Sequence, residues 1–230
     1  MKIGILMTGH LPDPLRARMG DLDGMFERLL DGHGFSFQSF DIEGMAFPDG
    51  PDACDGWLIT GSRHGVYEDH PFIPRLEAFI RDVHAADIPL VGICFGHQIV
   101  ASALGGRVEK FDRGWALGRS EYSVEGAAPM HLNAWHQDQV LEAPKGARAL
   151  GSNAFCKNAM LVYGDRMFTV QPHPEFEPDL IAAFVSERRG TGTYPDDLMD
   201  RAGHETAQPL DNARMGAALA RFLKTRTAHV

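Results

Sequence analysis

The segment from Leu90 to Gln98 constrains the fold more than any other part of the sequence. Residues 90–93 are apolar and read as a short buried strand, and the residues that follow Cys94 read as a helix. Gly92 and Gly96 flank Cys94 two positions away on either side, which leaves room for a sharp strand-to-helix turn. In α/β enzymes such a turn, the nucleophile elbow, presents one reactive side chain above the carboxyl edge of the sheet. The segment therefore predicts an α/β fold with a reactive thiol above the carboxyl edge of its sheet.

The rest of the first half of the chain alternates apolar runs with helical spacing of apolar residues. Strands are expected at 2–7, 35–42, 56–59 and 88–93, and helices at 14–30, 71–86 and 95–104. Strands that alternate with helices form parallel βαβ units. We therefore predict a flavodoxin-like, doubly wound fold, with a mainly parallel sheet and helices on both faces.

The pattern changes in the second half of the chain. Short alternating stretches at 118–124, 130–135, 160–163 and 167–170 follow one another with turns between them, which predicts an antiparallel extension of the sheet. A helix is expected at 179–188, a loop or lid at 190–209, and a C-terminal helix at 213–224. We expect residues 1–230 to form a single domain.

Composition excludes several classes of function. The net charge of -9 argues against a nucleic-acid partner, because proteins that bind nucleic acids present basic surfaces. No apolar run approaches the roughly 20 residues needed to cross a bilayer, so no membrane association is expected. Three scattered cysteines form no disulfide framework, which favours a reducing, cytoplasmic location.

Cys94 has the sequence context of a nucleophile. A helix that begins directly after it directs free N–H groups and the positive end of the helix dipole toward the sulfur, and both favour the reactive thiolate. Cys54 and Cys156 lack this context and are interpreted as buried structural thiols.

His173 is the strongest candidate for the base. It follows a short apolar strand within Gln171-Pro172-His173-Pro174-Glu175, and Glu175 can accept a hydrogen bond from the imidazole. The other histidines show no zinc-binding spacing, and no phosphate-binding glycine loop is present. We therefore predict neither a metal nor a cofactor.

Two motifs resemble those of one enzyme family. Residues 92–98, Gly-Ile-Cys-Phe-Gly-His-Gln, resemble the G-x-C-x-G-x-Q signature of class I (triad-type) glutamine amidotransferases, and residues 171–175 resemble their H-P-E signature. The resemblance implies the triad Cys94, His173 and Glu175. It also implies an oxyanion hole formed by the backbone N–H groups of Gly61 and Phe95, with substrate contacts from Gln98, Trp135 and His136.

The resemblance implies hydrolysis of the γ-amide of glutamine through a γ-glutamyl thioester on Cys94, with a synthetase as a possible partner. The stand-alone length and residues 93–98 and 135–138 look closest to GMP-synthase-like amidotransferases and to γ-glutamyl peptidases, which cleave glutathione-like substrates. Gly61-Ser62-Arg63 replaces the Gly-Gly-Pro typical of synthetase-linked members. A γ-glutamyl peptidase is therefore the first alternative, and a catalytically silent binding or regulatory module is the second.

Overall fold

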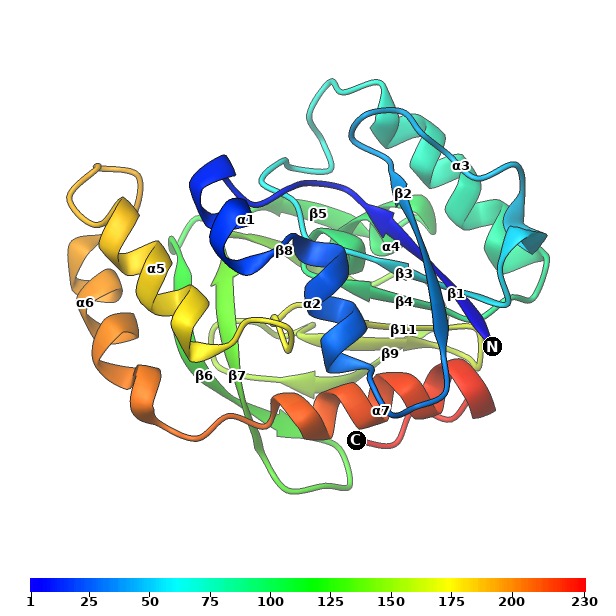
Figure 1. The fold of residues 1–230 in the computed structure, drawn as a ribbon. Coiled ribbons are helices and arrows are strands. Elements are labelled where there is room, and N and C mark those ends of the chain that lie inside the picture. Colours follow the sequence, from blue (N-terminus) through cyan, green and yellow to red (C-terminus); the bar gives the residue numbers. More distant parts are fainter.

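The computed structural model describes residues 1–230. They form one nine-stranded sheet with helices packed around it (Figure 1). The strand order is β2-β1-β3-β4-β11-β10-β9-β6-β7, and β5 and β8 form a separate two-stranded sheet. The strands are β1 (Lys2–Met7), β2 (Ser36–Asp41), β3 (Gly56–Ile59), β4 (Leu90–Ile93), β5 (Arg107–Lys110), β6 (Ala116–Val124), β7 (Met130–His136), β8 (Asp138–Glu142), β9 (Ala147–Ser152), β10 (Met160–Tyr163) and β11 (Met167–Val170).

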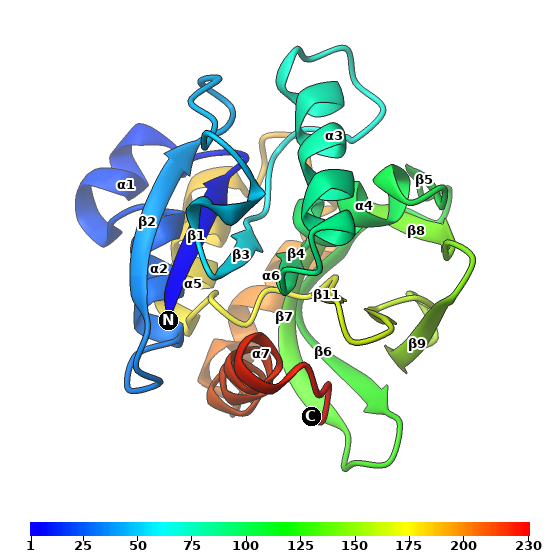
Figure 2. The ribbon, with the colours of Figure 1, turned by 90° about the vertical axis from the view of Figure 1, so that its right-hand side faces the viewer.

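Helices cover both faces of this sheet (Figure 2). They are α1 (Asp13–Met19), α2 (Leu22–Leu29), α3 (Phe72–Ala85), α4 (Phe95–Ala103), α5 (Pro178–Arg188), α6 (Asp196–His204) and α7 (Asn212–Thr225). Helices α3 and α4 pack on one face, and α2 and α7 pack on the other. This arrangement confirms the predicted flavodoxin-like α/β class. No helix is both long and apolar enough to cross a membrane.

The central strands are buried on both faces. In β1, Ile3 and Ile5 lie in the same apolar cluster as Phe26 of α2, whereas Leu6 lies in the cluster that contains α3 and α4. Side chains of a strand alternate between the two faces of a sheet, so a strand covered by helices on both sides must be apolar throughout. The continuous apolar runs of the sequence follow from this burial.

Strand β11 differs from the prediction of a wholly antiparallel second half. It pairs in parallel with β4, with Val170 opposite Ile93, and only its other edge pairs antiparallel, with β10. Strands β10, β9, β6 and β7 then continue as the predicted antiparallel extension. Because β4 and β11 run in the same direction, the residues that follow them emerge at the same edge of the sheet.

The helix predicted at 14–30 is two helices. Gly20, with φ of 82°, ends α1 in a conformation that favours glycine. Asp21 then begins α2, because its carboxylate accepts hydrogen bonds from the backbone N–H groups of Leu22 and Leu11. The apolar spacing continues across the break, so spacing alone did not reveal it.

The segment predicted as a loop or lid, 190–209, contains α6 and a short 3-10 turn, Glu205–Ala207. Met199 and Ala202 are buried in a cluster with Leu117 of β6. The segment was predicted as a loop because it is rich in Gly, Thr, Asp and Pro. The C-terminal helix predicted at 213–224 is α7. Strands β5, β8 and β9 were not predicted, because most of their residues are exposed or half-buried.

Candidate active site

Three neighbouring strands of the sheet lead to one site. Strands β3, β4 and β11 are adjacent and parallel, and Gly61, Cys94 and His173 follow them within a few residues. The backbone N–H of Cys94 donates to the carbonyl oxygen of Val170 at 2.9 Å, which joins the ends of β4 and β11. In open α/β sheets this carboxyl edge is where ligands bind.

The turn at Cys94 has the backbone geometry of a nucleophile elbow. Cys94 has φ of 52° and ψ of -103°, a conformation that side-chain-bearing residues rarely adopt. A Cβ atom at Gly92 would lie 2.6 Å from the carbonyl oxygen of Gly96, and one at Gly96 would lie 2.4 Å from that of Ile59. Both flanking positions therefore require glycine, and the strain at Cys94 is held by the packing of the turn.

This strain gives a stability prediction. Cys94→Gly should be more stable than Cys94→Ala, with a free energy of unfolding about 1 kcal/mol higher. Glycine adopts a positive φ without strain, whereas alanine does not. Cys54 provides a matched control, since it is equally buried but has an extended φ of -138°. There the order should reverse, with Cys54→Gly less stable than Cys54→Ala. Urea unfolding of the four variants measures both differences. If Cys94→Gly is less stable than Cys94→Ala, as expected at position 54, then Cys94 is not strained.

His173 is fixed by Glu175 and Phe176. Its Nδ1 lies 2.7 Å from Oε1 of Glu175, and both side chains are buried. Its ring stacks on Phe176, with centroids 3.9 Å apart and planes 9° apart. With Nδ1 held by the carboxylate, Nε2 is the ring nitrogen left for a reacting group.

Asn133 of β7 also positions His173, and the sequence analysis missed it. Its carbonyl oxygen accepts from the N–H of His173 at 2.8 Å, and its Nδ2 donates to the carbonyl of Phe176 at 2.9 Å. Asn133 thus fixes both ends of the turn. No motif marks Asn133, because the contact joins residues far apart in the chain.

The electrostatics of His173 favour its charged form. Burial alone lowers the pKa of the imidazole, but the carboxylate of Glu175 and the side chain of Cys94 together raise it well above its usual range. An imidazolium next to Cys94 stabilises a thiolate, which is the nucleophilic form of cysteine. The pair can therefore supply both a nucleophile and an acid.

Gly61 lies against both of these groups. A Cβ atom there would be 2.9 Å from Cε1 of His173 and 3.7 Å from Cβ of Cys94. Its turn is held by Thr8, whose hydroxyl donates to the carbonyl oxygen of Gly61 at 3.1 Å. Phe95 is the first residue of α4, so its N–H has no acceptor within the helix. The structure thus brings the two predicted oxyanion-hole positions next to Cys94.

The three predicted substrate-contact residues all line the same cavity as Cys94. Gln98 donates its side-chain amide to the carbonyl of Asp138 at 2.9 Å and to Oε1 of Gln171 at 3.1 Å. Its own Oε1 is thus the atom it can offer to a ligand. Trp135 Nε1 and His136 Nε2 are buried without hydrogen-bond partners. Burial lowers the pKa of His136 to about 3, so its imidazole is neutral.

The cavity around Cys94 and His173 has a volume of about 350 Å³. A larger cavity, of about 820 Å³, lies on the other side of Glu175 between α2 and α5 and contains neither Cys94 nor His173. We assign the site to the smaller one because it holds the reactive groups. Its lining also includes aromatic and charged side chains, namely Arg63, Glu68, Lys110, Trp115, Asp138, Phe184, Arg188 and Tyr194.

Comparisons with known proteins show which family the chain belongs to. The sequence model of the family "Glutamine amidotransferase class-I" matches residues 48–186. A glutamine amidotransferase-like protein of Schizosaccharomyces pombe is 30% identical over 175 residues, which are 72% of this chain and 71% of that protein. Gamma-glutamyl peptidase 3 of Arabidopsis thaliana is 28% identical over 208 residues, 83% of this chain and 84% of the relative. The chain therefore belongs to the class I glutamine amidotransferase family, whose members are generally cysteine hydrolases.

A solved structure supports the fold independently. The crystal structure of a glutamine amidotransferase from Methylobacillus flagellatus superposes with a TM-score of 0.77, covers 98% of this chain and 92% of its own, and is 22% identical. At that identity the likeness shows the fold alone, and it confirms the flavodoxin-like architecture.

Proposed function

We propose that the protein hydrolyses the γ-amide of glutamine through a γ-glutamyl thioester on Cys94. The observation that supports this most is the convergence of Cys94, on a strained elbow, with a buried His173 that is paired to Glu175 at 2.7 Å. Inert buried thiols need neither feature. The same observation argues against a catalytically silent module, because silence requires neither backbone strain nor a charged base next to the thiol.

The reaction follows from the positions of these groups. The thiolate of Cys94 attacks the γ-carbonyl carbon, and the resulting oxyanion accepts hydrogen bonds from the N–H groups of Gly61 and Phe95. His173 then donates its proton to the departing nitrogen, which leaves the thioester. Water deprotonated by His173 attacks the thioester, releasing glutamate and restoring the thiolate. Glu175 keeps the imidazole oriented throughout.

Gln98, Trp135 and His136 are proposed to bind the amino-acid end of the substrate. Gln98 can accept from the α-ammonium through Oε1. The unpaired N–H of Trp135 can donate to the α-carboxylate, and Nε2 of the neutral His136, whose Nδ1 donates to the carbonyl of Asp138, can accept from the α-ammonium. A substrate group that satisfies these atoms removes the cost of leaving them unpaired.

A γ-glutamyl peptide is the second candidate substrate. Two observations favour it: the relative named gamma-glutamyl peptidase covers 83% of this chain, and the lining of the cavity includes Trp115, Arg188 and Tyr194. Arg188 donates to the hydroxyl of Tyr194 at 3.1 Å and lies over the ring of Phe184 at 4.3 Å. These side chains offer contacts to a leaving group larger than ammonia.

Glutamate release by the purified chain tests the proposal. Glutamine and a γ-glutamyl dipeptide are offered in parallel, at equal concentrations. We expect glutamate from at least one of them, and the faster substrate identifies the leaving group. Rapid cleavage of the dipeptide alone would replace glutaminase activity with peptidase activity. No glutamate from either, together with no labelling of Cys94 by a thiol-directed γ-glutamyl probe, would refute the proposal.

Four accompanying features are also proposed. The chain acts as one catalytic domain in the cytoplasm on a small-molecule substrate. Should glutamine be the substrate, a separate synthetase is the expected consumer of the ammonia. Co-purification of a synthetase that raises the rate of glutamate release would support the last of these.

A further inference from the structure

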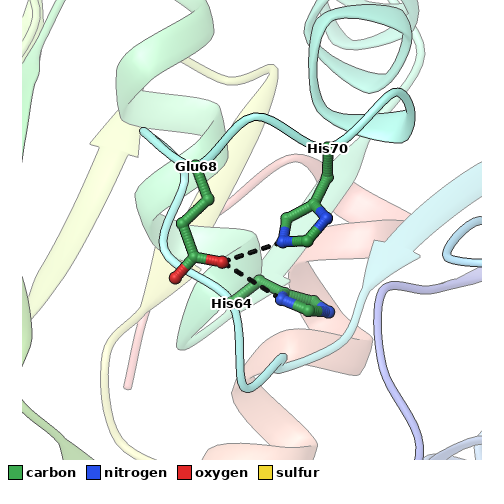
Figure 3. Close-up of side chains that lie close together, drawn as sticks. All are labelled: His64, Glu68 and His70. Carbon is green, nitrogen blue, oxygen red and sulfur yellow. Dashed lines mark hydrogen bonds and ion pairs between the residues drawn. The ribbon is translucent and has the colours of Figure 1, made fainter.

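Three potential metal ligands meet in the loop between β3 and α3 (Figure 3). They are His64, Glu68 and His70, and their ligand atoms all lie within 4.8 Å of one another. Figure 3 shows both imidazole rings directed at one carboxylate oxygen of Glu68. The sequence analysis passed over these histidines because their spacing matches no standard zinc motif.

The two distances to Glu68 are close to those around a tetrahedral cation. Nδ1 of His64 lies 3.2 Å from Oε2 of Glu68, and Nε2 of His70 lies 2.8 Å from the same atom. Ligands bound tetrahedrally to Zn²⁺ at its usual bond lengths stand about 3.3 Å apart. Small side-chain rotations would therefore place all three atoms around one ion.

The loop holds Glu68 ready for this role. The backbone N–H of Gly65 donates to Oε1 of Glu68 at 3.0 Å, which leaves Oε2 for the two histidines. His70 is held by stacking on Phe72, with the ring planes 18° apart. A site whose ligands are fixed before the ion arrives loses little conformational entropy on binding.

Glu43 provides an independent indication. Its Oε1 lies 3.0 Å from Nε2 of His64, the ring nitrogen that faces away from Glu68. Metal-bound histidines commonly donate their second N–H to a carboxylate in this way, which directs the other nitrogen at the ion.

We propose that His64, Glu68 and His70 bind a divalent transition-metal ion of the Zn²⁺ type. Two imidazoles and one carboxylate are ligands that Zn²⁺ favours, and three protein ligands leave one position for water or a substrate group. His64 and Glu68 also line the cavity that contains Cys94, so the ion would lie at the wall of that cavity. The proposal does not depend on the proposed hydrolytic activity.

Equilibrium dialysis against Zn²⁺, followed by metal analysis, tests this site. The measurement uses Cys94→Ser, because the thiolate of Cys94 could itself bind Zn²⁺. We expect one ion per chain. Adding His70→Asn should abolish binding, and adding Glu43→Gln should weaken it by about 10–100-fold, as expected for a carboxylate that orients a ligand. His33→Asn, which alters a histidine outside the cluster, is the matched control and should leave binding unchanged.

A thermal melt of each variant without metal checks that it is folded. Zn²⁺ should raise the melting temperature of Cys94→Ser and not that of the double variant with His70→Asn. Binding that survives His70→Asn, or no binding to Cys94→Ser at millimolar Zn²⁺, would overturn the proposal. In the second case the cluster is a network of hydrogen bonds and ion pairs only.

Discussion

Cys94→Ala should lower glutamate release to less than about a hundredth of the wild-type rate while the fold remains intact. Cys94 is the residue with a positive φ in the turn between β4 and α4, and no other thiol lines the cavity. Without the sulfur no thioester can form, and water would have to attack the γ-carbonyl directly. The rate with saturating substrate and the circular dichroism spectrum are measured together.

Cys54→Ala is the matched control for this variant. Cys54 and Cys94 are both 5% exposed, but Cys54 lies near Lys2 and Asp55, outside the cavity. Its replacement should leave the rate within about twofold of wild type, as expected for a site with no contact to substrate. A Cys94→Ala variant that keeps more than a hundredth of the rate would rule out Cys94 as the nucleophile.

His173→Ala should lower the rate by about 10²- to 10⁴-fold, the usual contribution of a general acid and base. It removes the imidazolium that stabilises the thiolate and the proton that the leaving nitrogen needs. Labelling of Cys94 by a neutral alkylating reagent at pH 7 should slow in parallel, because the positive charge beside the sulfur is lost. Loss of hydrolysis with unchanged labelling would mean that His173 does not interact with the thiol.

Glu175→Gln should lower the rate less than His173→Ala does, because a glutamine retains an oxygen that can accept from Nδ1 of His173 and the imidazole itself remains. An amide performs this orienting role in cysteine proteases with a Cys-His-Asn triad. The two variants are compared under identical conditions. A loss in Glu175→Gln equal to or greater than that in His173→Ala would contradict the roles assigned to these two residues.

Local patterns were enough to predict the parallel half of the fold and the elbow. The continuous apolar runs at β1, β3 and β4 arise from burial on both faces, and the glycines around Cys94 are required by contacts below 3 Å. The placement of β11 was harder to predict. Its four residues are all buried, and such a run fits a strand of either direction. The direction of β11 follows only from its parallel pairing with β4, which the sequence does not show.

Residues that act through distant contacts escaped the sequence analysis. Asn133 precedes His173 by forty positions in the chain and meets it only because β7 folds back over the site. Glu43 likewise meets His64 through the path of the loop that follows β2. Neither contact has a local pattern, so a sequence without its fold cannot reveal it.

The most direct test of the central claim is covalent labelling of the folded protein with a thiol-directed γ-glutamyl probe, followed by peptide mass spectrometry. We expect one label per chain, on Cys94, and protection of Cys94 by glutamine or by a γ-glutamyl dipeptide. Cys54 and Cys156 should remain unmodified, because both are buried away from the cavity. Labelling that falls on another residue, or that leaves Cys94 free, would contradict the assignment of Cys94 as the nucleophile for γ-glutamyl substrates.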